Sequence, residues 1–253
     1  MYKRGQVAVF VIVGVVLVFA LVLLFVFRTT LREGFKESVN KQEYLNSEIN
    51  QITKVIDECV NKESKNAFKI FGNNGGYFDP VDYVSYYGNK ISVICDNVKD
   101  KKYCNAKPLS KEDSNKRLSI YIKKKLDRCI DIDDFKDRNY KFEDKDLNVD
   151  VKINIEEVYV NVIYPIVLTY ENAEVKKNNF SKKIKIPLGK AMSLANFIAS
   201  QRAKTGDFDV ISYSLLSRGD FTIREREIFP NTFYIIDFPN KEYKFNLAIE
   251  EEA

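Results

Sequence analysis

Histidine and tryptophan are both absent from this chain of 253 residues. The lack of His excludes imidazole general bases, Ser-His-Asp and Cys-His catalytic pairs, and zinc or haem sites that use His ligands. The four cysteines form no Cys-x-x-Cys pair, so neither a zinc ribbon nor a thioredoxin-like motif is indicated. We therefore predict no catalytic residue, no metal site and no cofactor, and we expect no enzymatic activity.

A charge excess of one sign is also lacking. Lys and Arg number 40 and Asp and Glu number 36, which leaves a net charge of only +4. Basic residues alternate with acidic ones instead of clustering as they do in nucleic-acid-binding proteins. Apolar residues make up 45% of the chain and aromatic residues 13%, enough for a globular core. We expect a folded domain with a solvated charged surface and no nucleic-acid partner.

The longest hydrophobic run lies between Val7 and Phe27 and contains no charged residue. About 21 residues in a helix span about 30 Å, the thickness of the hydrocarbon core of a bilayer. In lipid an isolated segment must satisfy its own backbone, so a helix is expected despite the many Val and Phe residues. The run is longer than the core of a secretory signal peptide and lacks a small-x-small cleavage site. Residues 1–30 are therefore predicted to form a transmembrane anchor.

The orientation of this anchor is set weakly by charge, because basic residues stand on both sides of the run. The cysteines favour one side, since an even number of well-spaced Cys beyond an anchor is typical of disulfides in an oxidising compartment. The alternative is four free thiols in a cytosolic domain. We expect a single-pass protein of the cell membrane whose larger part lies outside the cytoplasm.

The N-terminus, Lys3-Arg4-Gly5-Gln6-Val7-Ala8, resembles an archaeal class III signal peptide of the prepilin type. The resemblance implies cleavage between Gly5 and Gln6, with the apolar helix left attached. That family often carries Glu at the fifth mature position, where the carboxylate pairs within the filament. Phe10 occupies that position here, which weighs against filament assembly.

Apolar residues recur at steps of three and four from Leu31 to Cys59, close to a heptad period. Gly34 and the polar residues 40–43 are places where such a helix would bend or break. For residues 31–42 two interpretations stay open: a stalk that packs on a second copy or a partner helix, or a helix that packs on its own domain. For residues 45–71 the broader apolar face favours its own domain.

This helix is expected to end in the run Gly72-Asn73-Asn74-Gly75-Gly76, because Gly and Asn tolerate positive φ. The run follows a helix instead of preceding one, so it does not have the order of a phosphate-binding loop. Strands at residues 83–87 and 90–95 flank Gly88-Asn89, which predicts a hairpin.

Ser110, followed three residues later by Asp113, is typical of the N-terminus of a helix, and this helix is predicted to run to about Ile130. Cys129 lies on the apolar face of this helix, and Cys59 lies on the apolar face of the first. We therefore predict Cys59–Cys129 as a link between helices and Cys95–Cys104 as a local link, although four cysteines permit three pairings.

An acidic segment follows, with Asp131, Asp133 and Asp134. A calcium-binding EF-hand loop beginning at Asp131 would need Gly at its sixth position and Glu at its twelfth, where Lys136 and Phe142 stand instead. A solvated turn is the expected structure, and a looser cation site is the alternative.

From residue 147 the pattern changes to period two, which predicts antiparallel strands with one wet face. We expect strands at 147–153, at 158–170 with a bulge or edge at Pro165, and at 180–188. A helix at 189–204 and strands at 221–228, 232–238 and 243–249 complete the chain. Asn179-Phe180-Ser181 matches a glycosylation sequon, a tripeptide that also arises by chance.

Several short motifs together resemble a group of uncharacterised single-pass membrane proteins from small-genome archaea of the nanoarchaeal kind. They are Cys59, the turn Gly75-Gly76-Tyr77, the pair Tyr86-Tyr87, the segment Tyr121-Ile122 and Cys129. The resemblance would cover most of the chain. It implies a membrane protein and supports the Cys59–Cys129 pairing, and it implies no activity.

The fold class expected is α+β: a transmembrane helix and helical stalk, then helices packed on an antiparallel sheet. Residues 31–145 would form a helical, Cys-containing subdomain and residues 146–253 a β-rich one. Three functions follow as hypotheses. The first is a membrane-anchored structural or interaction protein, with the bilayer and a protein partner or second copy as its contacts. The second is a pilin-like filament subunit, and the third is an extracytoplasmic enzyme that uses carboxylates.

Overall fold

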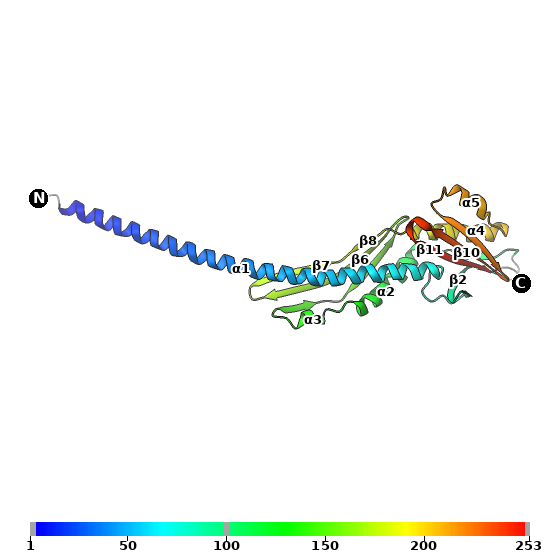
Figure 1. Cartoon of the computed structure of the whole chain (residues 1–253), viewed down its shortest axis with the longest axis horizontal. Helices are drawn as coiled ribbons and strands as arrows, with labels where there is room; N and C mark the ends of the chain where they lie inside the picture. The colour runs from blue at the N-terminus through cyan, green and yellow to red at the C-terminus, as the bar shows by residue number, and fades with distance from the viewer. Residues whose placement is uncertain (1–3, 99–101, 251–253) are drawn as a thin grey trace.

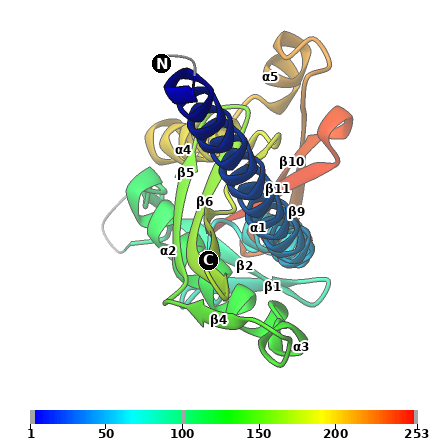
Figure 2. The same ribbon diagram turned by 90° about the vertical axis from the view of Figure 1, so that its left-hand side faces the viewer.

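The computed structural model describes residues 4–98 and 102–250, and describes side chains for residues 14–24, 40–98 and 102–250. The molecule is elongated, with the N-terminal end of one long helix at one extreme and the C-terminus at the other (Figure 1). The fold is α+β, with helices packed on largely antiparallel sheets. Figure 2 looks along the long helix towards the head, the part of the molecule that contains the sheets. The short helices α3 (Asp133–Lys136) and α5 (Val210–Leu216) lie at opposite margins of the head.

Helix α1 (Arg4–Asn73) is continuous and is interrupted neither at Gly34 nor at residues 40–43. A single Gly costs a helix only about 1 kcal/mol, which neighbouring turns easily offset. The helix ends where the sequence predicts, and the Gly76 amide closes its last turn by donating a hydrogen bond to the Phe71 carbonyl at 2.8 Å. Gly75 and Gly76 follow with φ values of 72° and 88°.

The predicted anchor forms the first part of α1, and much of it lies among residues whose side chains the structure does not describe. Within the described part of the chain, no helix is both long and apolar enough to cross a membrane. In residues 14–24 the side chains are exposed all round the helix, and the large apolar ones are 54–67% accessible.

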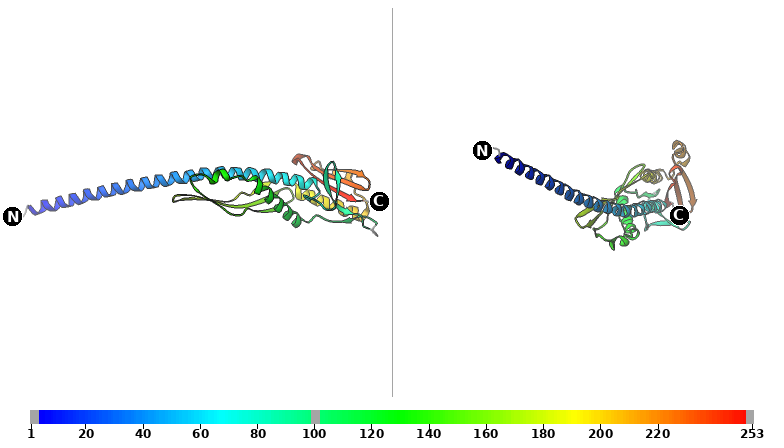
Figure 3. Two further views of the ribbon diagram at one scale, coloured as in Figure 1. Left: turned by 90° about the horizontal axis from the view of Figure 1, so that it is seen from below. Right: turned by 60° about the vertical axis from the view of Figure 1, so that its left-hand side comes forward.

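One sheet, the proximal sheet, lies beside the second half of α1 and consists of β4–β8 (Figures 1 and 3). Its long strand β6 (Val158–Tyr170) pairs with β5 (Asn148–Ile153) and β8 (Lys182–Ile184) in its first half. Strands β4 (Lys141–Asp144) and β7 (Ala173–Asn179) pair with its second half. The register shifts between Ile163 and Ile166, which confirms the irregularity predicted at Pro165.

The strand expected at 180–188 is wrong in position. The chain reverses directly after Tyr170, with Glu171 at a φ of 52°, and runs back as β7. The polar composition of β7 concealed it, because most of its residues face water. Only Lys182–Ile184 of the expected strand pairs with β6.

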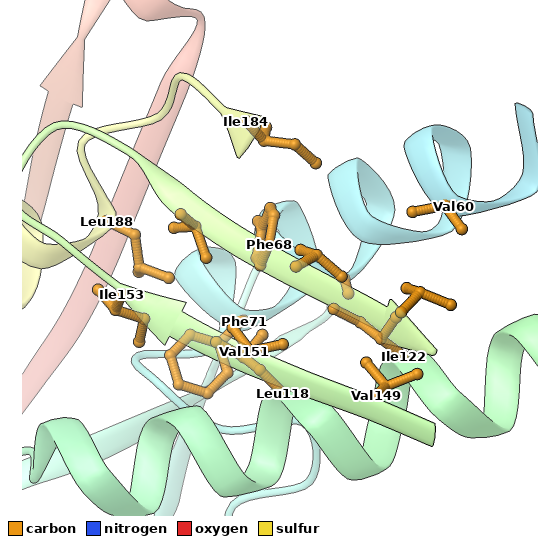
Figure 4. Close-up of a cluster of buried hydrophobic side chains, with 14 of the residues drawn as sticks. Val60, Phe68, Phe71, Leu118, Ile122, Val149, Val151, Ile153, Ile184 and Leu188 are labelled. Atoms are coloured by element: carbon orange, nitrogen blue, oxygen red, sulfur yellow. The ribbon is translucent and has the colours of Figure 1, made fainter. Parts of the chain in front are cut away.

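Helices α1 and α2 (Lys111–Cys129) pack on the inward face of the proximal sheet, where the buried side chains form a continuous core. Figure 4 shows part of this core, with side chains from both helices and from β5 meeting between them. The residues labelled there are Val60, Phe68, Phe71, Leu118, Ile122, Val149, Val151, Ile153, Ile184 and Leu188. Residues 45–71 of α1 therefore pack on their own head, as predicted.

The second sheet, the distal sheet, lies at the C-terminal end of the molecule and joins segments from both halves of the chain (Figure 3). Its strand order is β1 (Tyr83–Tyr86), β2 (Asn89–Asp96), β11 (Tyr243–Glu250), β10 (Asn231–Phe238) and β9 (Thr222–Ile228). The short strand β3 (Asn105–Ala106) pairs with β2. Strands β2 and β11 are parallel, an exception to the predicted antiparallel pairing.

Two helices flank the distal sheet. Helix α4 (Leu188–Thr205) contacts β2, β3, β10 and β11, and the short helix α5 (Val210–Leu216) contacts β9. Helix α5 has no periodic pattern that predicts it from the sequence, because Ile211, Leu215 and Leu216 point into solvent instead of forming a buried apolar stripe.

Both disulfides join the cysteines that the sequence analysis paired. Cys59 on α1 is bonded to Cys129 at the end of α2, with their Cα atoms 5.8 Å apart. Cys95 on β2 is bonded to Cys104, with Cα atoms 5.4 Å apart. The first bond ties together the two helices that cover the proximal sheet, and the second closes a loop beside the distal sheet.

Candidate interaction surface

The acidic segment with Asp131, Asp133 and Asp134, considered above as a loose cation site, lies on the surface. Asp133 begins the short helix α3 (Asp133–Lys136), and its carboxylate accepts a hydrogen bond from the Lys136 ammonium at 2.9 Å. Asp131 Oδ1 accepts from the Asp133 amide at 3.4 Å. Over the described ranges, no group of three or more acidic or cysteine side chains is placed to hold a metal ion. The carboxylates of Asp131 and Asp133 thus accept hydrogen bonds from neighbouring residues of the same turn.

The sequon residue Asn179 is exposed at the end of β7. Its Oδ1 accepts a hydrogen bond from the Ser181 amide at 2.8 Å, and the Ser181 hydroxyl donates to Asn161. Between them Phe180 is buried. Gly5 and Gln6 lie in the part of α1 whose side chains are not described, so cleavage there stays a prediction.

A hollow of about 320 Å³ lies between the end of α2 and strand β4, and three of its lining residues are Asp127, Asp144 and Asp146. The hydroxyl of Tyr164 donates to Asp144 Oδ2 across 2.6 Å. Burial, and then the hydrogen bond to Asp144, raise the pKa of Tyr164 far above its usual range. The hydroxyl therefore keeps its proton and acts as a hydrogen-bond donor that holds β4 against β6.

At the distal end, the hairpin β1–β2 folds over the outer face of the distal sheet. Only Val93 and Cys95 of β2 pair with β11 in the described register, so the first half of β2 leaves the plane of the sheet. Tyr86 then stacks on Phe233 of β10, with ring centroids 4.8 Å apart. The hairpin and the outer face together bury a small second core of Ile91, Val93, Phe233 and Ala248.

The hairpin leaves a groove beside it, over the outer face of β9 and β10. This tyrosine groove has a volume of about 560 Å³. Its lining residues are Ser85, Tyr86, Tyr87, Arg224, Arg226, Glu227, Ile228 and Ile235. Arg224, Arg226 and Ile228 alternate along β9 and so share one face, and Ile235 lies opposite Arg224 in the register. The groove therefore has a floor of β9 and β10 and a wall made by the end of β1.

Large apolar side chains are exposed around this groove. Tyr87 is 88% exposed, Phe229 is 79% exposed, and Ile228 on the floor is half exposed. Apolar side chains that gather on one end of a protein and are rimmed by charged groups are typical of an interaction surface.

Tyr87 occupies a backbone conformation that disfavours its side chain. Tyr87 and Gly88 form the turn between β1 and β2 with φ values of 46° and 79°, and Asn89 pairs with Tyr86. Such hairpin turns favour Asn, Asp or Gly at both central positions, and a bulky residue there costs on the order of 1 kcal/mol. The turn predicted at Gly88-Asn89 is thus shifted by one residue. The shift places an aromatic ring at the tip of the hairpin.

The lining of the groove carries two arginines and one glutamate. Arg224 makes an ion pair with Asp237 at 3.4 Å. Arg226 makes no ion pair with any side chain that the structure describes. Glu225 points to the other face, where its carboxylate accepts a hydrogen bond from the Tyr234 hydroxyl at 2.5 Å. The groove thus offers an unpaired guanidinium beside aromatic and aliphatic surface, which suits recognition.

No protein-family model matches the chain, and comparisons with curated proteins and with solved structures find no significant match. The tyrosine groove could not be predicted from the sequence, because its two groups of lining residues are separated by more than a hundred positions. One local signal was available: a Tyr next to Gly at the centre of a hairpin, where Asn would be the usual residue.

Proposed function

We propose that this protein is a membrane-anchored extracytoplasmic interaction protein. The helix between Val7 and Phe27 spans the cell membrane, and the disulfide-bonded head presents its distal end to a partner. The observation that carries the proposal is the gathering of exposed apolar side chains around a groove at the end farthest from the anchor. The proposal assigns the protein no catalytic role and no cofactor.

The anchor is supported by the run itself and by its surroundings. No charged residue occurs between Val7 and Phe27. Apolar side chains in residues 15–24 are exposed on every side of α1. A helix that is apolar all round is stable when it is surrounded by lipid or protein, not by water. The bilayer is the partner that its composition fits.

The outward orientation is supported by the cysteines. All four are close enough to be bonded in pairs, and none is left free. Disulfides persist in oxidising compartments and are rare in the cytosol. An exposed Asn179 would then be open to glycosylation, and its modification would add independent support for this orientation.

A pilin-like filament subunit is the second candidate, favoured by one structural observation. Helix α1 runs unbroken from Arg4 into a β-rich head, and its first residues resemble a prepilin signal. In that case Gly5–Gln6 would be cleaved and α1 would pack against other copies. Residues 31–42 are the stretch of stalk through which a homo-oligomer would form.

Intact mass of the protein extracted from native membranes separates these proposals. An interaction protein retains Lys3 and Arg4, stays in the membrane pellet after alkaline washing, and resists alkylation until it is reduced. Loss of residues 1–5 together with shearing from the cell surface would favour the filament subunit. Four thiols that react without reduction in the unfolded protein would overturn the outward orientation.

A further inference from the structure

We infer that the tyrosine groove binds an extended acidic segment of a partner protein, which adds as a strand to the free edge of β1. The inference rests on the proposed function and names the partner chemistry of that surface. Three observations support it: the free edge of β1, the alternating side chains of β9 on the floor, and the Arg226 guanidinium, which has no ion-pair partner among the described side chains.

The backbone contribution comes from β1. Among the described residues β1 pairs with β2 alone, and it is an end strand of the distal sheet. Ser85 and Tyr86 of this strand line the groove. An end strand presents a row of N–H and C=O groups that an extended peptide can complete. The other end strand, β9, carries alternating Arg and Glu, a pattern that discourages pairing at its own edge.

The side-chain contribution comes from the floor. Arg224, Arg226 and Ile228 lie about 7 Å apart in succession, the spacing of side chains on one face of a strand. An extended segment lying over them meets guanidinium groups and apolar surface at the same spacing. Arg pairs with carboxylates in a fork-like geometry, so Glu or Asp at alternate positions fits this floor.

Charge and size decide the class of occupant. The Arg226 guanidinium has no described ion-pair partner, whereas Glu227 at the rim would repel a uniformly anionic polymer. A hollow of about 560 Å³ accommodates several side chains of a short extended segment. An acidic glycan could use the Tyr rings and the Arg side chains, but it would leave the edge of β1 unpaired.

The exposed ring of Tyr87 is the strongest indication that this surface binds a partner. Its ring packs edge-on against Tyr86 at 4.6 Å and is otherwise in solvent, in a conformation that favours Asn or Gly. Asn or Gly would suit this backbone conformation better, so stability of the fold does not account for a Tyr at position 87. Replacing Tyr87 by Asn therefore separates a role in folding from a role in binding.

The test uses the full chain in detergent micelles and fluorescence anisotropy. The probe is a pool of fluorescein-labelled heptapeptides in which Glu alternates with Val, Ile or Tyr. Three comparison probes are the same pool with Lys for Glu, the same pool with alternate amides N-methylated, and a labelled oligogalacturonate. We expect the acidic pool to bind, and the Lys and N-methylated pools to bind at least about tenfold more weakly.

Three variants place the binding in the groove. Tyr87→Asn should raise the melting temperature slightly and weaken probe binding about tenfold, since an aromatic anchor is lost while the turn improves. Arg226→Gln should weaken binding about fivefold and reduce its dependence on salt. Leu215→Ser, an exposed change on α5 outside the groove lining, is the matched control and should leave binding unchanged.

Several outcomes would overturn the inference. They are no binding of the acidic pool at about millimolar concentration, equal binding of the N-methylated pool, tighter binding of oligogalacturonate, or a Tyr87→Asn variant that binds normally. These outcomes would reject peptide binding by the groove without rejecting the proposed membrane-anchored function. A protein that stays in the membrane with two disulfides but ignores the peptides would retain the anchor and lose only this partner.

Discussion

The proximal and distal sheets follow the same alternation of side chains but use their faces differently. In the proximal sheet, β5 alternates strictly between exposed and buried residues, with one face against α1 and α2 and the other in water. In the distal sheet, Phe233 and Tyr234 of β10 are adjacent, point to opposite faces and are both buried. The proximal sheet is thus a one-sided layer, whereas the distal sheet is covered on one face by α4 and on part of the other by its own hairpin.

This difference explains where the candidate surface arises. A layer that has water on one face places mostly polar side chains outside, as β5 and much of β7 do, with Tyr159 and Ile163 of β6 as partly exposed exceptions. A layer whose second face is covered only in part leaves apolar groups at the margin of the cover. We therefore expect the proximal sheet to govern stability and the distal margin to govern binding.

The largest expected effect contrasts two phenylalanines. Phe68 on α1 is 1% exposed within the proximal core, and Phe229 beside the groove is 79% exposed. Phe68→Ala should lower the free energy of unfolding by about 3 to 5 kcal/mol, because it leaves a cavity between α1 and the sheet. Phe229→Ala should change it by less than about 0.5 kcal/mol. Denaturant unfolding of both variants measures the contrast, and similar losses would remove it.

The two disulfides give the next comparison. Cys59–Cys129 closes a loop of 70 residues and Cys95–Cys104 a loop of 9. Loop-closure entropy predicts losses of about 4 kcal/mol for Cys59→Ser with Cys129→Ser, and about 3 kcal/mol for Cys95→Ser with Cys104→Ser. Thermal unfolding of the two double variants compares them. A larger loss in the second would mean that the short loop supports the distal sheet by packing.

Alkaline pH should lower the free energy of unfolding, because the buried Tyr140 in the proximal region resists ionisation. Burial, and then the nearby Glu48 carboxylate, raise the pKa of Tyr140 to about 12. Because the folded-state pKa lies above the unfolded value of about 10, the stabilisation is complete below pH 10 and is lost as the pH rises towards 12. Urea unfolding measures the free energy of unfolding across this pH interval. In Tyr140→Phe this free energy should fall less steeply with pH than it does in the native protein. An unchanged slope would assign the effect to other tyrosines.

The smallest effect concerns the link between the regions. The Lys190 ammonium on α4 pairs with Asp220, ahead of β9, and with Glu156 in the turn between β5 and β6 at 3.4 Å. Both carboxylates are half exposed, so Lys190→Met should cost less than about 1 kcal/mol. High salt should remove the difference between this variant and the native protein. A difference that persists in high salt would point to packing of the Lys stem instead.

Much of the architecture could be predicted because it depends on local patterns. The end of α1 at Gly72–Gly76, the period-two strands β5 and β6, and the irregularity at Pro165 follow from backbone preferences of single residues. The cysteine pairing followed from the faces of two amphipathic helices. Strand β7 and helix α5 were missed, since each shows mostly polar or unpatterned residues to water.

The sequence by itself determined the apolar run, the α+β class and most of the residues that face the core, since these depend on hydropathy and on the periods of helix and strand. Only the tertiary structure decided that β2 lies parallel to β11 and that the hairpin bends over β10. Those contacts bring Tyr87 near Arg226 across a long stretch of chain. No local pattern encodes such a meeting, because it depends on which faces remain uncovered once the core is filled.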